Sequence, residues 1–273
     1  MRISLITPTF NQAEFIEETI QSVLDQKYPD LEWIVIDALS TDSTPQILAR
    51  YAHLPWLKII READEGQSDA INKGMRLATG TIASWLNSDD LLVRGALHHI
   101  AQAFLDHPAA TVIYGRGAKI NRSSELLRVV PYRPFDRKRL ATALEAVQPA
   151  IYFRRDVFWE AGGLRKDLAY AMDWDLLIRL AQRGEVIALD TLIAKIRYYE
   201  NTKTATGGWK RMREIAQIGK HHNGFLDWNH LSFKIRQLTP RLPLARKIVD
   251  EFFWRMARTR PIMVLSWPDI KQR

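Results

Sequence analysis

The first 120 residues alternate short apolar runs with longer stretches in which apolar positions recur every three or four residues. Runs of the first kind predict buried strands, and stretches of the second kind predict amphipathic helices. The expected strands are residues 3–7, 31–36, 57–60, 81–86 and 111–114, and the expected helices are 13–26, 44–52, 68–77 and 94–105. This alternation predicts an α/β fold with a mixed, mostly parallel sheet flanked by helices. Ligands of such sheets bind beyond the carboxyl ends of the strands.

The rest of the chain has a less regular pattern. Residues 121–149 show no clear period, 151–154 predict a strand, and 173–183 predict a helix that ends before Gly184. After residue 200 the pattern predicts a basic helical tail that is rich in tryptophan. We therefore expect two domains, residues 1–200 and 201–273, the first of which divides into halves 1–120 and 121–200.

Charge is distributed unevenly between these two parts. The chain has 39 Lys/Arg and 31 Asp/Glu residues, for a net charge of +8. Of these, 15 basic and 5 acidic residues follow residue 200, which leaves 24 basic and 26 acidic residues before it. The tail therefore carries +10 and the first 200 residues carry −2, so the basic character belongs to the tail.

The composition excludes several kinds of chemistry. At 47% hydrophobic and 26% charged residues, the chain resembles ordinary globular proteins. It has no cysteine, which excludes disulfides, thiolate metal sites and cysteine nucleophiles. It also has no run of about 18 apolar residues, and its first residues do not read as a secretion signal. From these features we expect a cytoplasmic protein without a membrane-spanning helix.

Polar residues follow the first two predicted strands. Thr7, Pro8 and Thr9 close the first strand, because a proline there donates no ladder hydrogen bond. Such a loop can offer backbone and hydroxyl groups to a nucleotide, or it can be a simple turn. Asp37 follows the second strand, where a carboxylate can accept hydrogen bonds from a base or a ribose. A helix cap explains Asp37 poorly, because an acid directly after a buried strand needs a partner.

Two adjacent carboxylates, Asp89 and Asp90, come after the fourth predicted strand, preceded by Asn87 and Ser88. Neighbouring carboxylates at the end of a buried strand repel each other unless a cation lies between them. Oxygen ligands suit Mg²⁺ or Mn²⁺, and either ion would also bind substrate phosphates. The alternative is a helix N-cap followed by an acid in the first turn.

Two further pairs of charged residues lie on predicted helices. Asp69 and Lys73 are four residues apart and share one helix face. They form either an exposed ion pair or an acid for a nucleoside with a cation near its phosphates. Asp173 and Asp175 stand at the start of a helix, where the macrodipole favours acids, so neither alone indicates a function.

Together, these residues resemble the family 2 glycosyltransferases, whose nucleotide-binding architecture is called GT-A. Each matching stretch is weak alone, but the series follows the family's order over about residues 1–185. The stretches are Thr7 to Asn11, Asp37 with Ser40 to Asp42, Gly66 to Gly74, Gly80, Leu86 to Asp90, Gln148 with Pro149, Gly162 with Gly163, and Asp173 to Arg179.

The resemblance assigns a role to each matching residue. The donor would bind to Thr7, Pro8, Thr9, Asp37, Asp69, Lys73, Asn87, Ser88 and Asp89. Asp89 and Asp90 would hold the metal, and Asp173 would be the general base. On the acceptor side would lie Gln148, Trp174 and Asp175, the last as a substitute for the base.

Three departures from the family's pattern bear on these roles. Asn87 replaces a common acid, and Met172 replaces the glutamate of the usual acid pair beside Asp173. Ala38 and Leu39 stand where many members have two glycines, so the backbone of this loop is expected to avoid positive φ.

The resemblance implies an inverting glycosyltransferase that depends on Mn²⁺ or Mg²⁺. It would move a sugar from a nucleotide-diphosphate donor, with UDP the most frequent in the family, to a hydroxyl of a saccharide or lipid-linked glycan in cell-surface polysaccharide synthesis. Residues 1–120 would bind the donor and 121–200 the acceptor. The alternative is a non-catalytic nucleotide-sugar-binding scaffold of the same fold, which Asn87 and Met172 favour.

The tail suggests a partner of its own. Basic, aromatic helices lie in the headgroup layer of anionic membranes. Residues 247–260 have apolar side chains at helical spacing and fit this description, which suits a peripheral protein at the inner face of the cell membrane. Alternatively, the aromatic residues cover the catalytic domain or form a dimer contact. No nucleic-acid motif accompanies the charge, so we expect no nucleic-acid partner.

Overall fold

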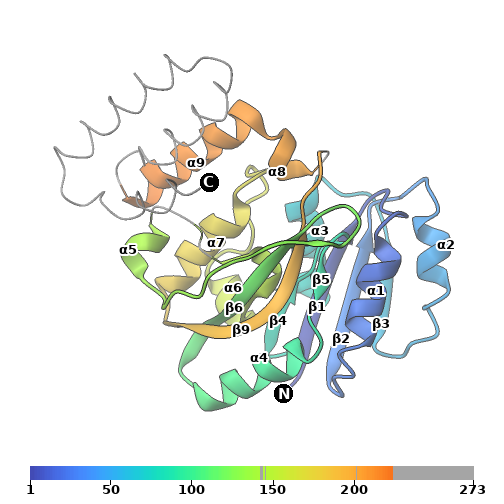
Figure 1. Cartoon of the computed structure of the whole chain (residues 1–273), viewed down its shortest axis with the longest axis horizontal. Helices are drawn as coiled ribbons and strands as arrows, with labels where there is room; N and C mark the ends of the chain where they lie inside the picture. Colours follow the sequence, from blue (N-terminus) through green and yellow to red (C-terminus); the bar gives the residue numbers. More distant parts are fainter. Residues whose placement is uncertain (142–143, 145, 201, 224–273) are drawn as a thin grey trace.

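The computed structural model describes residues 1–223 except 142, 143, 145 and 201 (Figure 1). One mixed sheet runs through it, flanked by helices, which confirms the expected fold class. The strand order is β3 (Leu57–Arg61), β2 (Leu31–Asp37), β1 (Ile3–Thr9), β4 (Ile82–Trp85), β8 (Ile151–Arg154), β6 (Ala110–Ile120), β9 (Glu185–Arg197) and β5 (Leu91–Leu92), and β7 (Leu126–Val129) pairs with β6.

The sheet has two parts with different pairing. Strands β3, β2, β1 and β4 are parallel to one another. Strand β8 is antiparallel to both β4 and β6, whereas β6 and β9 are again parallel. The carboxyl ends of β1, β2 and β4 therefore meet at one edge, where the ligand of such a sheet binds.

Helices cover both faces of the sheet. One face packs against α1 (Ile16–Leu24), α2 (Thr44–Ala49) and α4 (Ala96–Asp106). The other packs against α3 (Gln67–Leu77), α5 (Arg137–Leu140), α6 (Arg155–Glu160), α7 (Met172–Ala181) and α9 (Gly208–Asn223). The remaining elements are a 3₁₀ turn at Gln148–Ala150 and α8 (Lys203–Thr206).

Strand β2 illustrates why its residues form a buried central strand. Trp33 and Val35 belong to the core under α1, whereas Ile34 and Ile36 belong to the core under α3. Successive side chains of a strand point to opposite faces, so a continuous apolar run fills both cores.

The structure differs from the predicted elements mainly after residue 110. Strand β6 covers eleven residues rather than the four expected, and the thirteen-residue β9 has no counterpart in the prediction. Asp190 and Lys195 interrupt the apolar pattern of β9. Irregular residues 121–149 contain β7 and α5. In the first part, helix α1 begins at Ile16, three residues later than expected.

Part of the predicted helical tail is described. Helices α8 and α9 cover residues 203–206 and 208–223, and the buried Ile215 and Ile218 of α9 join the same core as α7. The membrane-binding prediction for residues 247–260 lies outside the described residues. Within the described part, no helix combines the length and apolar character needed to cross a membrane.

Candidate active site

Strand β1 continues through Pro8 and ends at Thr9, whereas the predicted strand ended at Thr7. The carbonyl of Ile6 accepts the last hydrogen bond from the β4 side, from the amide of Leu86, and the pairing of β1 with β4 ends there. Pro8 faces this same side, so its missing N–H leaves no ladder position empty. The Thr7 hydroxyl accepts a hydrogen bond from the Trp33 indole at 2.9 Å and therefore stabilises the core.

Thr9 and Asp37 are register partners at the ends of β1 and β2. Asp37 Oδ1 accepts a hydrogen bond from the amide of Ser40 at 3.0 Å, and Arg61 Nε lies 3.3 Å from Oδ2. Oδ2 of Asp37 and Oγ1 of Thr9 are both buried and take part in no hydrogen bond within the described structure. Asp37 Oδ2 has the ion pair with Arg61 but no hydrogen bond, and Thr9 Oγ1 has no partner among the described residues. Since buried polar atoms are nearly always hydrogen-bonded in native proteins, these two oxygens indicate a site for a polar ligand.

Leu39 corrects one expectation, because its φ is +59° although the loop was expected to avoid positive values. The loop 38–41 lies beside residues 9–11. Ala38 donates a backbone hydrogen bond to Thr9, and Thr41 donates one to the side chain of Asn11. These contacts hold Leu39 in the left-handed region, where a residue with a Cβ is strained by roughly 1–2 kcal/mol.

Leu39→Gly is therefore expected to raise the free energy of unfolding by about 0.5–1 kcal/mol, after the entropy cost of a glycine is subtracted. Leu39 is 46% exposed, so little packing is lost. Urea denaturation measures this change. Ala38→Gly is the matched control, because Ala38 has no positive φ and should lose stability. Equal losses in both variants would contradict the prediction.

Asp69 and Lys73 form an ion pair on α3, with 3.4 Å between Asp69 Oδ2 and Lys73 Nζ. A second lysine, Lys166, lies 3.3 Å from Asp69 Oδ1. Burial raises the pKa of Asp69, but the amide of Glu65 and the two ammonium groups outweigh it and hold the pKa below its ordinary value. Asp69 thus stays ionised and gathers two cations beside the carboxyl ends of the parallel strands.

The turn that follows β4 is joined to two other segments by Asn87. Its Nδ2 donates to Asp90 Oδ2 at 2.9 Å and to Gln148 Oε1 at 3.4 Å. Its Oδ1 accepts from Gln67 Nε2 at 2.7 Å. The structure thus brings Gln148, predicted on the acceptor side, into contact with a residue predicted to bind the donor.

Asp90 is 4% exposed, and both of its carboxylate oxygens are occupied. Oδ1 accepts from the amide of Arg197 at 3.0 Å and Oδ2 from Asn87. Burial, reinforced by the charge of Asp89, raises the pKa of Asp90 well above its ordinary value. Thr19 fixes the same turn, because its hydroxyl donates to the carbonyls of Ser88 and Asp90. Asp90 therefore stabilises the conformation of the turn through its buried hydrogen bonds.

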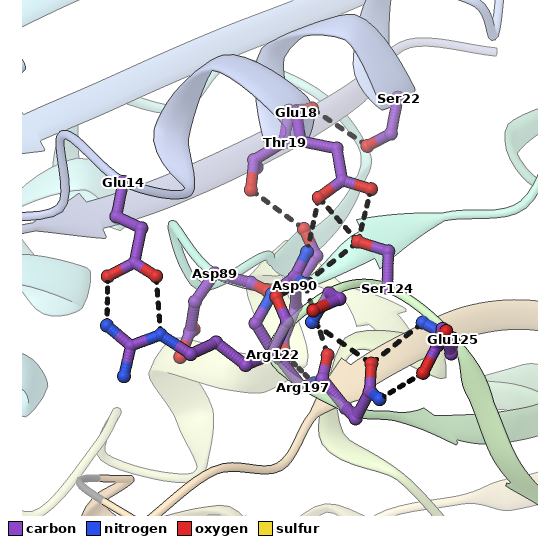
Figure 2. A network of polar contacts seen from close by, with 12 residues as sticks. Glu14, Glu18, Thr19, Ser22, Asp89, Asp90, Arg122, Ser124, Glu125 and Arg197 are labelled. Atoms are coloured by element: carbon purple, nitrogen blue, oxygen red, sulfur yellow. Dashed lines mark hydrogen bonds and ion pairs between the residues drawn. The ribbon is translucent and has the colours of Figure 1, made fainter.

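Arg197, at the end of β9, holds this turn from the other side (Figure 2). Its Nε donates to the carbonyl of Asp89 at 2.9 Å, and its Nη2 donates to Glu18 at 2.6 Å. Nη1 donates to the carbonyl of Arg122 and the hydroxyl of Ser124 in the loop between β6 and β7. A buried arginine with all these donors engaged fixes the turn in one conformation.

Asp89 is the carboxylate of the turn that remains open to a ligand. It is half-buried, and among the described residues its side chain accepts one hydrogen bond, from the Tyr199 hydroxyl at 3.4 Å. Burial raises the pKa of Asp89. The described residues contain no cluster of three histidines, cysteines or carboxylates that could enclose a metal. One carboxylate nevertheless fits Mg²⁺ or Mn²⁺, which is commonly held by one or two carboxylates together with substrate phosphates and water.

The three predicted site residues at the start of α7, Asp173, Trp174 and Asp175, point in different directions. Asp173 is partly exposed, accepts a hydrogen bond from the amide of Trp174 and forms no ion pair within the described residues. Burial raises the pKa of Asp173, an effect that the Trp174 amide and the cations of Arg211 and Lys203 only partly offset. Trp174 lies in the core instead of on the acceptor side, and its indole donates to the carbonyl of Leu140.

Asp175 also lies away from Asp173. Residues two apart on a helix point in nearly opposite directions, and Asp175 is 0% exposed. Its oxygens lie 2.7 Å from Arg179 Nη2 and 2.9 Å from His222 Nε2. These partners leave Asp175 unavailable to an acceptor.

Lys203 was missed by the sequence reasoning and links the two halves of the site. Its Nζ donates to Gln67 Oε1 at 3.1 Å, and Gln67 in turn contacts Asn87. Desolvation lowers the pKa of Lys203, and the charges of Glu214 and Asp173 partly offset this effect. Lys203 and Tyr199 follow β9. Because the sequence analysis did not predict this strand, it had no signal that could place the two residues near the site.

Comparisons with known proteins identify the family. The model of the family described as "Glycosyl transferase family 2" matches residues 4–162. A PGL/p-HBAD biosynthesis glycosyltransferase of Mycobacterium bovis is 31% identical over 182 residues, which cover 64% of this chain and 68% of that protein. The hyaluronan synthase of Pasteurella multocida is 24% identical over 237 residues, or 85% of this chain and 24% of the synthase.

Two solved structures share the fold. TarS 1–349 of S. aureus in complex with UDP-GlcNAc has a TM-score of 0.66 at 19% identity, covering 90% of this chain and 74% of that one. The mannosyltransferase PcManGT of Pyrobaculum calidifontis in complex with GDP-Man and Mn²⁺ has a TM-score of 0.63 at 22% identity, covering 98% and 76%. Since the family model covers more than half of the sequence, this chain belongs to glycosyl transferase family 2.

Proposed function

We propose that this glycosyltransferase moves a sugar from a nucleoside-diphosphate donor to a hydroxyl of a saccharide or lipid-linked glycan, with inversion, in cell-surface polysaccharide synthesis. One observation carries the proposal. Asn87, Gln67 and Lys203 form a hydrogen-bonded chain that leads from the turn carrying the open carboxylate of Asp89 toward Asp173, whose charge acts on Lys203. Oγ1 of Thr9 and Oδ2 of Asp37, at the ends of β1 and β2, are buried without a hydrogen bond in the described structure. Relatives that make hyaluronan and chondroitin favour the same class of product.

The donor's nucleoside is assigned to the ends of β1 and β2. Asp37 Oδ2 and Thr9 Oγ1 can accept hydrogen bonds from a base or a ribose. UDP is the first candidate, because TarS 1–349 is a fold neighbour in complex with UDP-GlcNAc. GDP is the second candidate, because the fold neighbour PcManGT is in complex with GDP-Man. Lys73 and Lys166, gathered by Asp69, supply positive charge at the same edge.

The divalent cation is assigned to Asp89 instead of Asp90, whose two oxygens are already occupied. PcManGT, with Mn²⁺ in its structure, favours Mn²⁺ as the first ion to test. When bound, such an ion offsets negative charge on the leaving diphosphate. The ammonium of Lys203 adds a second positive charge near Asn87 and Asp173.

Asp173 is assigned as the general base. Its carboxylate accepts the proton of the acceptor hydroxyl as the hydroxyl oxygen bonds to the anomeric carbon. The bond between that carbon and the diphosphate oxygen breaks on the opposite face, so the configuration inverts. A carboxylate whose pKa is raised is a stronger base than an ordinary aspartate, and burial provides this for Asp173.

Three cations favour an acceptor that carries phosphate near its reacting hydroxyl. Lys119 and Arg128 face each other in the β6–β7 pair, where like charges repel. Arg211 has a buried Nε without a hydrogen-bond partner, and its charge reaches both Lys119 and Asp173. None of the three forms an ion pair with any residue that the structure describes. A lipid-linked diphosphate acceptor would supply the missing anion, and a position at the inner face of the membrane remains a prediction.

Calorimetric titration of UDP, GDP and dTDP, with and without Mn²⁺, tests the donor assignment. We expect one nucleotide to bind at least about tenfold more tightly with Mn²⁺, because the ion joins Asp89 to the diphosphate. Release of that nucleotide from its sugar conjugates then distinguishes an enzyme from the scaffold alternative, which would bind without turnover. Absence of binding by all three nucleotides would contradict the proposal.

A further inference from the structure

Helix α9 contacts the beginning of α7 through Glu214. One carboxylate oxygen accepts a hydrogen bond from the amide of Ala169 at 2.8 Å. The other accepts from the amides of Tyr170 at 2.7 Å and Ala171 at 3.3 Å. Three consecutive backbone donors thus converge on one side chain that lies more than forty residues further along the chain.

These three amides lead directly into the first turn of α7. The residue before the helix is Ala171, which has no side chain able to cap it, and no side-chain cap is present. The amides at a helix start need acceptors, and negative charge is favoured there. Glu214 supplies an acceptor from another helix for the amide of Ala171 and for the two amides before it. It so fixes the segment that leads to Asp173, two residues beyond Ala171.

A second contact aligns α9 with the same turn. His222 Nε2 lies 2.9 Å from Asp175 Oδ1, and both side chains are buried. Between these contacts, Ile215 and Ile218 pack in the core that contains Met172. Asp173 is therefore flanked by a residue on each side that α9 holds, Ala171 through Glu214 and Asp175 through His222.

We propose that Glu214 is a positioning residue for Asp173, and that α9 contributes to the active site by holding the segment before α7 in place. This inference rests on the proposed role of Asp173 as the base. Glu214 need not touch either substrate. It acts by fixing the backbone of residues 169–171, and through it the direction in which the Asp173 carboxylate points.

The test compares Glu214→Ala and Glu214→Gln with Gln217→Ala, a control at an exposed position of the same helix. Amide hydrogen exchange over residues 165–175 reports the contact, and release of nucleoside diphosphate from a panel of UDP-, GDP- and dTDP-sugars reports turnover. In Glu214→Ala we expect faster exchange and a kcat lower by about 10–100-fold. The KM for the donor should change less than about twofold, because the donor residues lie on other elements.

Glu214→Gln retains the size of the side chain and one acceptor oxygen, so its kcat should lie between those of Glu214→Ala and the unaltered protein. This variant tests the proposal even if Glu214→Ala unfolds. Faster exchange with unchanged kcat, or an equal loss in Gln217→Ala, would overturn the positioning role. Full turnover by Asp173→Asn would instead refute the assignment of the base, while the exchange result for Glu214 would still stand.

Discussion

Asp173→Asn is expected to lower kcat by about 10²–10⁴-fold and to leave nucleotide affinity within about twofold. Within the described residues, Asp173 forms no ion pair and accepts a hydrogen bond only from the neighbouring Trp174 amide. An amide in its place keeps the shape but cannot accept a proton. Turnover with the preferred sugar nucleotide and calorimetry with the nucleotide alone measure the two quantities.

The pH dependence provides the control for this expectation. A base acts in its deprotonated form, so kcat should fall as the pH drops through its pKa. Because burial raises the pKa of Asp173, that acid limb should lie above the range of an ordinary aspartate. The limb should be absent from the residual activity of Asp173→Asn. An unchanged profile in the variant would show that another group accepts the proton.

The adjacent acids Asp89 and Asp90 are expected to respond in opposite ways to the same substitution. Asp89→Asn should remove the Mn²⁺-dependent part of nucleotide binding, a loss of about tenfold or more, with little change in stability. Within the described part of the chain, its side chain has a single hydrogen bond, 3.4 Å long, from Tyr199. Calorimetry with and without Mn²⁺ measures this loss.

Asp90→Asn should instead lower the free energy of unfolding by about 1–3 kcal/mol. Its new amide group would face the Nδ2 donor of Asn87, and the site offers it no other acceptor among the described contacts. Urea denaturation measures the change. If Asp90→Asn abolished Mn²⁺-dependent binding while Asp89→Asn retained it, the two assignments would have to be exchanged.

The sequence could place the predicted donor residues at one edge of the sheet because their signals are local. In a parallel sheet the carboxyl ends of strands share one edge, so Asp37 and Asp89 could be assigned to it from the strands that precede them. The family resemblance added the order of these segments, and the family itself is confirmed by the model that matches residues 4–162. Pattern and resemblance together could not decide between Asp89 and Asp90, because that depends on which oxygens distant residues occupy.

The residues that the sequence could not reveal act over long separations. Arg197 meets Glu18 across 179 positions, and Glu214 meets Ala169 across 45. Asp175 shows the same limit. From its position two residues after Asp173, the sequence could not tell whether it contacts the acceptor or forms a buried ion pair. Its partner His222 lies 47 positions away. Such pairings follow from tertiary packing, which no local period encodes.

Arg197 also sets an order of events during synthesis. The turn at Asp89 leaves the ribosome more than a hundred residues before the arginine that fixes it, and the Glu18 partner leaves earlier still. Long-range contacts of this kind form late in folding. We therefore expect a nascent chain that stops before β9 to lack a fixed Asp89 turn, because the arginine that holds this turn has not yet been made.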